Sequence, residues 1–280
     1  PSMVRGDEHL AGVLERLASI DGSQVSGLLS VTEFTVRSRA NSGGELEQMA
    51  FVGGADDHPV RNLVSRAPAF FSGGSAVVTG AGGNFSAGAD LDRLVGALLA
   101  GEEPQNEYEA RIRDDLSLIY KGFLKEYVTE TPIIAAVEGY CYAGGTEILQ
   151  AFDVRVAGEN AEIAISEVKR GLFPMSAATI RLPRQIPYTV AMEMLLVGEP
   201  LSGARAAEIG LVGHAVPDGR ALAEAQELAA SIAANGPLAV RNVKKSVIEA
   251  QCLPAAAAFQ REMELGMEVM GSKDAREGPK

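Results

Sequence analysis

Two short stretches of the chain, at positions 75–79 and 133–137, are mostly apolar and do not alternate with polar residues. Apolar runs of four to eight residues bounded by turn residues are typical of strands buried on both faces of a sheet. Glycines follow the first run, and Thr131-Pro132 precedes the second. We therefore predict a buried strand at each position. Further strands are expected at 34–37, 163–165 and 212–216.

Elsewhere the apolar residues recur every three or four positions, which predicts helices. Helices are expected at 10–20, 45–51, 92–99, 112–123, 146–152, 188–197, 202–210, 220–234 and 237–250. Ser202 suits the cap of a short helix, and Pro237 suits the first turn of a longer one. Strands that alternate with helices, followed by about a hundred mainly helical residues, indicate an α/β layered core.

Small residues follow both buried strands. One segment, 85–90, reads Phe-Ser-Ala-Gly-Ala-Asp, and the other is Ala143-Gly144-Gly145 just before the helix predicted at 146–152. Glycine lets the backbone approach a ligand closely, and the start of a helix adds partial positive charge. Such turns are suited to hold an oxygen that becomes negative during a reaction.

Two carboxylates are close to the second turn in the sequence. Glu147 is in the first turn of the predicted helix, and Glu167 follows the strand predicted at 163–165. If they converge beside the turn, they could give and take protons around one water molecule. The alternative is that both are ordinary glutamates, one favoured by the helix dipole and one solvated at the surface.

Composition narrows the classes of function. The chain has 280 residues, of which 46% are hydrophobic, and a net charge of −12. It is long enough for one large domain or two small ones, and too acidic to favour nucleic acid or an anionic membrane as a partner. Cys141 and Cys252 form no CxxC pair, and the three histidines lack metal-ligand spacing. We therefore expect no metal. No stretch is long and apolar enough to span a membrane, and we expect a cytoplasmic protein.

Several motifs together resemble the enoyl-CoA hydratase/isomerase family, also called the crotonase superfamily. The matching segments are FSAGAD at 85–90, PIIAAVEG at 132–139, AGGTE at 143–147, SEV at 166–168 with GL at 171–172, and GEPLS at 198–202 with AEIGLV at 207–212. Each motif is weak alone, but their order and spacing all fit, from Ser75 towards the C-terminus. The segment after Pro174 departs from the family pattern, with Met-Ser-Ala-Ala in place of glycines.

The resemblance implies an α/β fold, a crotonase-type spiral of ββα units with a C-terminal helical trimerisation region. The core carrying the acyl-CoA site would span residues 3–200, and the helical region 201–280. The resemblance also implies a homotrimer or a dimer of trimers, with an acyl-CoA thioester as substrate. It implies no cofactor, because coenzyme A is part of the substrate.

Site residues follow from the same resemblance. The backbone N–H groups of Ala89 and Gly144 would form the oxyanion hole. Glu147 and Glu167 would hold the water, with Glu167 supplying the proton that reaches C2 of a 2-enoyl-CoA. The residues expected to contact the substrate are Ala87, Gly88, Asp90, Gly145 and Met175.

Three activities remain open at this point. Hydration of a 2-enoyl-CoA is favoured, because both glutamate positions are occupied. An enoyl-CoA isomerase, or other enolate chemistry on an acyl-CoA such as dehydration of a hydroxyacyl-CoA, could use the same turns with a single proton-shuttling base. A non-catalytic acyl-CoA-binding scaffold would need the turns but not both glutamates.

Overall fold

The structure, a computed structural model of the chain, describes residues 33–37, 75–89 and 129–278, together with 101, 103–104, 110, 113–115, 120 and 123–125. For 33–37 it describes the backbone. The helices predicted at 10–20, 45–51 and 92–99, and most of the one at 112–123, lie outside the described residues, as does Asp90.

The larger sheet has five described strands in the order β1-β2-β3-β5-β8. These are β1 (Glu33–Arg37), β2 (Ser75–Thr79), β3 (Ile133–Val137), β5 (Val154–Gly158) and β8 (His214–Val216). β1 pairs antiparallel with β2, and the other pairs are parallel, with Val78 opposite Ala135 and Ala136 opposite Val156. The parallel strands all end at the same edge, where binding sites in α/β sheets usually form.

A second, three-stranded sheet lies beyond that edge. Its strands, in the order β4-β6-β7, are β4 (Tyr140–Tyr142), β6 (Glu162–Ala164) and β7 (Leu201–Ser202). Short helices accompany it: α6 (Gly144–Leu149), the 3-10 helix η4 (Glu167–Arg170), α7 (Ala178–Gln185), α8 (Tyr188–Val197) and α9 (Gly203–Glu208). Another 3-10 helix, η2 (Ala81–Gly83), follows β2.

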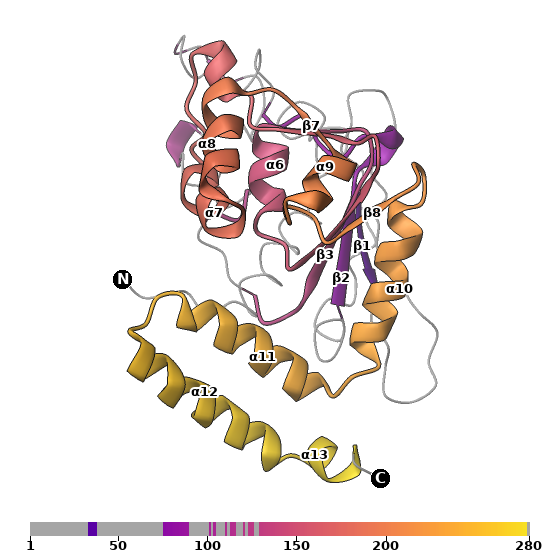
Figure 1. Cartoon of the computed structure of the whole chain (residues 1–280), viewed down its shortest axis with the longest axis vertical. Helices are drawn as coiled ribbons and strands as arrows, with labels where there is room; N and C mark the ends of the chain where they lie inside the picture. Colours follow the sequence, from indigo (N-terminus) through magenta and orange to yellow (C-terminus); the bar gives the residue numbers. More distant parts are fainter. Residues whose placement is uncertain are drawn as a thin grey trace.

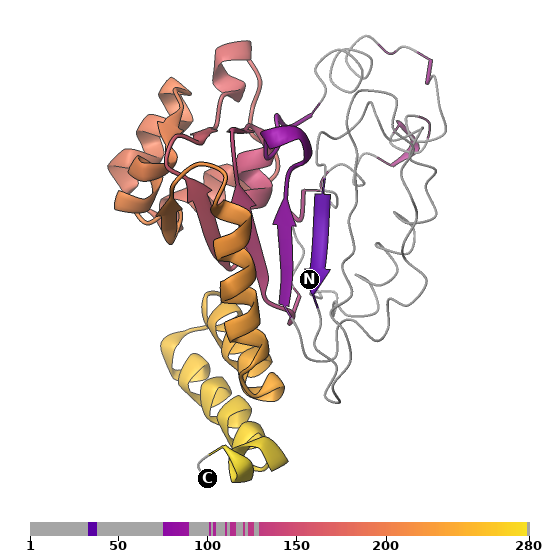
Figure 2. The same cartoon turned by 90° about the vertical axis from the view of Figure 1, so that its right-hand side faces the viewer.

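Both faces of the larger sheet are covered, as the two apolar runs predict. Ile134 and Ala136 of β3 pack against α10 (Ala221–Ala233). Ala135 and Val137 join the larger core cluster with residues of α6 to α9. Because successive side chains of a strand point to opposite faces, one apolar run serves both layers. Figures 1 and 2 show α10 along one face of the sheet and α6 to α9 on the other side.

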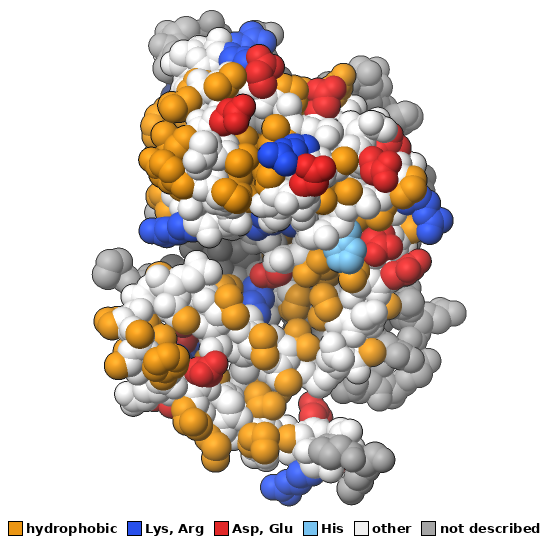
Figure 3. All heavy atoms as spheres, in the orientation of Figure 1, with side chains coloured by type: hydrophobic (Ala, Val, Ile, Leu, Met, Phe, Trp, Pro, Cys, Tyr) orange, Lys and Arg blue, Asp and Glu red, His pale blue; other side chains and the backbone are white. Residues whose placement is uncertain are grey.

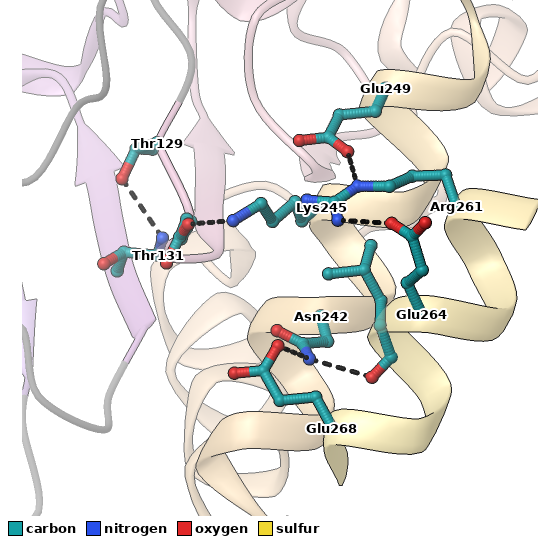
Figure 4. A network of polar contacts seen from close by, with 10 residues as sticks. Thr129, Thr131, Asn242, Lys245, Glu249, Arg261, Glu264 and Glu268 are labelled. Atoms are coloured by element: carbon teal, nitrogen blue, oxygen red, sulfur yellow. Dashed lines mark hydrogen bonds and ion pairs between the residues drawn. The ribbon is translucent and has the colours of Figure 1, made fainter. Parts of the chain in front are cut away.

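Three helices at the C-terminal end stand beside the starts of the strands: α11 (Pro237–Ala250), α12 (Ala255–Met270) and α13 (Lys273–Glu277). Lys245 reaches Glu130 at 3.0 Å, and Asn242 donates to the Leu265 carbonyl at 3.0 Å. Arg261 bridges Glu249 and Glu264 (Figure 4). These contacts join α11 to α12, and Lys245 joins α11 to the segment before β3.

Most predicted elements that lie in the described part are confirmed. The strands at 75–79 and 133–137 and the helices at 188–197 and 237–250 have the predicted bounds, and Ser202 caps α9 through its hydroxyl. The helix predicted at 146–152 instead runs from Gly144 to Leu149. The sequence did not predict α7, because Pro183 lies inside it and proline disfavours a helix interior.

The predicted boundary at residue 200 falls next to β7. The elements that follow it, β8 and α10, pair with or cover the larger sheet, and the helices that stand apart begin at Pro237. The division into two domains remains a prediction.

Candidate active site

The site is built around the start of α6, which lies just beyond the end of β3. Ala143 adopts φ 51° and ψ −121°, a conformation rarely seen for a residue with a side chain. Its N–H donates to the Ala164 carbonyl at 2.9 Å, which ties the turn to β6. Gly144 and Gly145 are the first two residues of α6, so their N–H groups have no acceptor within the helix and point away from it.

The segment predicted to carry the other oxyanion donor packs directly on this turn. Ser86 pairs with Cys141 in an isolated bridge, and its carbonyl accepts from Tyr142 N at 2.8 Å. Gly88, at φ +86°, is so close that a Cβ there would be 2.9 Å from Gly144 N. Ala89, the residue after Gly88, is therefore close to Gly144, as an oxyanion hole of two backbone donors requires.

The two glycines of the turn are needed for packing. A Cβ on Gly145 would be 2.5 Å from the Ser86 carbonyl oxygen, and one on Gly144 would be 2.4 Å from the ring of Phe123. Phe123 itself is 3% exposed. The turn is thus held between the 85–89 segment and an aromatic ring, which fixes the direction of the Gly144 N–H.

Glu147 is buried one turn into α6, with 3% of its surface exposed. Its Oε1 accepts hydrogen bonds from Ser176 N at 2.7 Å and from Ala178 N at 3.1 Å. Burial raises the pKa of this carboxyl above its usual value, while the two N–H groups, the Ser176 hydroxyl and the charge of Arg181 oppose that rise. The side chain is therefore held in one place as a hydrogen-bond acceptor.

Glu167 comes to the same place from η4, at the end of β6. Its Oε2 is buried and has no hydrogen-bond partner among the described residues. Burial and the nearby negative charge of Glu147 raise its pKa to about 7, against the lowering effect of the Glu167 and Ser166 N–H groups. A carboxyl with this pKa can both donate and accept a proton near neutral pH.

The other predicted site residues in the described part differ in how exposed they are. Ala87 is exposed, Gly88 is buried and Ala89 is partly buried. Gly145 is buried under Ser86, so its described contacts are packing contacts. Met175 is 53% exposed, and its sulfur accepts a hydrogen bond from the Tyr120 hydroxyl at 3.6 Å.

Comparison with known proteins places the chain in a family. The model of the family described as enoyl-CoA hydratase/isomerase matches residues 72–280, which is most of the chain. The chain belongs to the enoyl-CoA hydratase/isomerase family. The expectation drawn from the sequence motifs is thereby confirmed.

Curated members of the enoyl-CoA hydratase/isomerase family resemble the chain over most of its length. A Mycobacterium tuberculosis protein named enoyl-CoA hydratase EchA19 is 47% identical over 204 residues, which is 73% of this chain and 74% of that protein. A Shigella flexneri protein named carnitinyl-CoA dehydratase is 32% identical over 210 residues, which is 73% of this chain and 76% of that protein.

Solved structures of this family resemble the fold. The structure of an enoyl-CoA hydratase from Mycobacterium tuberculosis is 39% identical, with a TM-score of 0.61, covering 72% of this chain and 75% of the other. That of an enoyl-CoA hydratase from Bacillus anthracis is 34% identical, with a TM-score of 0.63, covering 72% and 75%.

Sequence reasoning missed two features of this family member. The backbone of Ser176 and Ala178 supplies the donors to Glu147, whereas the sequence shows this segment only as a departure from the family pattern. The motifs also do not indicate Arg181, whose charge acts on Glu147. A backbone donor leaves no mark on residue type, so only the structure could find the first feature. A basic residue in a mostly apolar segment is the signal that could have indicated the second.

Within the described ranges of the chain, no group of three or more His, Cys, Asp or Glu side chains could hold a metal ion. No helix there is both long and apolar enough to cross a membrane.

Proposed function

We propose that this family member adds water to the double bond of a 2-enoyl-CoA thioester, giving a 3-hydroxyacyl-CoA. The observation that carries the proposal is the convergence of two partly or fully buried glutamates beside a turn with outward-facing backbone N–H groups. The 47% identity to a protein named enoyl-CoA hydratase supports the same reaction.

In the proposed reaction, the thioester oxygen accepts hydrogen bonds from Ala89 N–H and Gly144 N–H. Glu147 takes a proton from a water molecule while the water oxygen bonds to C3. The C2–C3 double-bond electrons move towards the thioester and give an enolate, whose charge the two N–H groups stabilise. One such donor is typically worth about 3 kcal/mol.

Glu167 then gives its proton to C2, and the thioester carbonyl forms again. The assignment of Glu167 as the acid rests on its pKa of about 7, which leaves a substantial protonated fraction at neutral pH. Glu147 Oε1 already accepts two backbone N–H groups, which suits a base. Afterwards Glu147 loses a proton to solvent and Glu167 regains one, so that the sum of the reaction is one added water.

The proposed substrate contacts are those expected from the family resemblance: Ala87, Gly88, Asp90, Gly145 and Met175. The reaction as written needs no group beyond the side chains, the water and the CoA thioester itself. We also propose the cytoplasm as the location and a homotrimer or a dimer of trimers as the assembly.

A second candidate reaction is removal of water from a hydroxyacyl-CoA with a polar acyl group. The 32% identity to a protein named carnitinyl-CoA dehydratase favours it. The same two glutamates would act in the opposite direction, because a catalyst accelerates both directions of one reaction.

The test is loss of the conjugated enoyl-thioester absorbance on mixing the protein with crotonyl-CoA, then with longer and bulkier enoyl-CoAs. We expect turnover, and we expect Glu147→Gln and Glu167→Gln each to lower kcat by roughly 10²- to 10⁴-fold while a saturated acyl-CoA still binds. The matched control is Glu159→Gln, since Glu159 is exposed. Its kcat should equal that of the wild type.

Two other results would refute hydration. Binding of acyl-CoA without turnover of any enoyl-CoA would indicate a scaffold. Consumption of a 3-enoyl-CoA without formation of a hydroxyacyl-CoA would indicate an isomerase.

A further inference from the structure

Arg181 is a partly buried cation that takes no part in any step of the proposed reaction. It lies on α7, the helix whose first residue, Ala178, donates its N–H to Glu147. Residues three apart on a helix share a face, so Arg181 and Ala178 lie on the same side of α7.

The guanidinium is anchored on one side by backbone carbonyls. Its Nη2 donates to Leu124 O at 2.7 Å and to Lys125 O at 3.0 Å. Leu124 has φ 53°, an unusual conformation for leucine, and its neighbour Phe123 is the residue whose ring packs on Gly144. Arg181 thereby ties α7 to the segment that supports the oxyanion turn.

One nitrogen of the guanidinium has no hydrogen-bonded partner in the described part of the chain. Nη1 is buried, and no acceptor for it exists among the described residues. Burying a charged donor without an acceptor costs free energy unless an opposite charge is close. The charge that opposes this cost is Glu147.

The other charged groups near this pair are few in the described part of the chain. Glu167, from η4, faces Glu147 and repels its charge. Arg155, from β5, faces Arg181, but its own donors are taken by the carbonyls of Gln150, Phe152 and Leu211. Arg181 is therefore the cation that acts directly on Glu147.

We propose that Arg181 is a positioning residue for the hydration reaction. Its charge favours the ionised form of Glu147 beside Glu167, and its two hydrogen bonds hold the Leu124–Lys125 backbone so that Phe123 fixes the Gly144 turn. The expected effect of Arg181 on catalysis rests on the proposed function. The expected effect of its charge on the titration of Glu147 does not depend on which reaction the protein catalyses.

The kinetic test is the pH profile of kcat/KM with crotonyl-CoA for Arg181→Met and Arg181→Lys. Activity needs Glu147 ionised, so kcat/KM falls below the pKa of Glu147. Loss of the positive charge in Arg181→Met should raise that pKa, so the acid limb of the profile should shift to higher pH by about one pH unit. Arg181→Lys keeps the charge, so its acid limb should stay at the wild-type position although kcat falls about tenfold from the lost pair of hydrogen bonds.

A direct titration separates this inference from the function. In a Glu167→Gln background, the side-chain carboxyl carbon of ¹³C-labelled Glu147 is followed by NMR with and without Arg181→Met. We expect the titration midpoint to rise by about one pH unit on loss of Arg181. The matched control is Arg184→Met, on the same helix but exposed, which should leave both the midpoint and the pH profile unchanged.

The outcomes are distinct. An unchanged midpoint in Arg181→Met, or an acid limb in Arg181→Lys that moves up by about one pH unit, overturns the proposal. If Arg181→Met does not fold, Arg181→Gln, which also removes the charge, replaces it in both measurements with the same expected shifts. A raised midpoint in a protein that hydrates no enoyl-CoA would support the electrostatic role and refute the proposed function.

Discussion

Glu147 and Glu167 have the same side chain but are held in different ways. Glu147 is fixed by two backbone N–H groups on one oxygen, whereas Glu167 has a buried oxygen that meets no hydrogen-bond partner among the residues that the structure describes. Burial is the main cause that raises the pKa of both. The fold therefore contains one carboxyl that suits proton uptake and one that suits proton release, which is the pair that water addition needs.

The raised pKa of Glu167 also predicts a cost to stability. Its pKa is near 4.5 when unperturbed and about 7 in the folded protein. The folded state thus binds more protons than the unfolded state between these values, so the free energy of unfolding falls as pH rises from about 4.5 to 7. Glu167→Gln should therefore stabilise the protein at pH 8 by on the order of 2 kcal/mol.

Thermal unfolding at two pH values measures this effect. The Tm of Glu167→Gln should exceed that of the wild type by roughly 4–8 °C at pH 8, and by much less at pH 5. Glu159→Gln is the control for the loss of one negative charge. An equal Tm difference at both pH values would contradict a link to the titration of Glu167.

At the scale of elements, α6 is a six-residue helix fixed at both ends. Ala143, in its strained conformation, sets the start. Arg155 donates to the carbonyls of Gln150 and Phe152 after its last turn, and Gln185 also donates to Gln150 O. A cation at the C-terminal end of a helix is favourable, and an isolated helix of this length would be unstable in water. The position of the Gly144 N–H thus depends on neighbours from other elements.

The contact between the 85–89 segment and α6 can be tested at Gly88. In Gly88→Ala, the new Cβ would be 2.9 Å from Gly144 N, so one backbone must shift. We expect kcat for crotonyl-CoA to fall by roughly 10²- to 10³-fold, the loss typical of removing one oxyanion donor. Stopped-flow or steady-state absorbance measures it.

The control for backbone strain is Gly219→Ala. Gly219 has φ +81°, close to the +86° of Gly88, but a Cβ there meets nothing within 4 Å in the described part of the chain. Both variants should lose stability from an alanine at positive φ, and Gly88→Ala should lose more because its Cβ also collides with Gly144. If Gly219→Ala lost as much activity as Gly88→Ala, the collision with Gly144 would not be the cause.

At the scale of the whole molecule, two apolar surfaces stand out. One lies over α7 and α8 and the other over α12, and both are visible on the left of Figure 3. The residues on α12 follow one helix face, namely Phe259, Met263, Met267 and Met270, each at least 62% exposed. Large contiguous apolar surfaces are typical of protein–protein interfaces, which supports the proposed trimer.

Sedimentation velocity tests the assembly. We expect a mass of three or six chains, each of 29.3 kDa. Phe259→Asp and Met263→Asp should weaken the assembly, because each places a charge in the apolar face of α12. A wild-type protein that sediments as a 29.3 kDa monomer at micromolar concentration would contradict the proposal.

The sequence by itself determined the buried strands and most long helices of the described part. Short apolar runs such as 133–137, bounded by turn residues, are typical of strands covered on both faces, and local patterns such as Ser202 before α9 act within one turn. The residues alone indicated the two small-residue turns and made both glutamates candidates, and the motifs indicated the family, which implies their roles. These features depend on residue type and on neighbours a few positions away.

Only the tertiary structure decided how the site is held. Ser176 and Ala178 reach Glu147 from about thirty positions away, and they do so through backbone N–H groups that every residue except proline has. Arg181 acts on the same carboxyl from a helix that contains a proline, which the sequence pattern did not predict. The pKa of a buried group depends on burial and on nearby charges, and both are set by the packing of distant segments, not by local sequence.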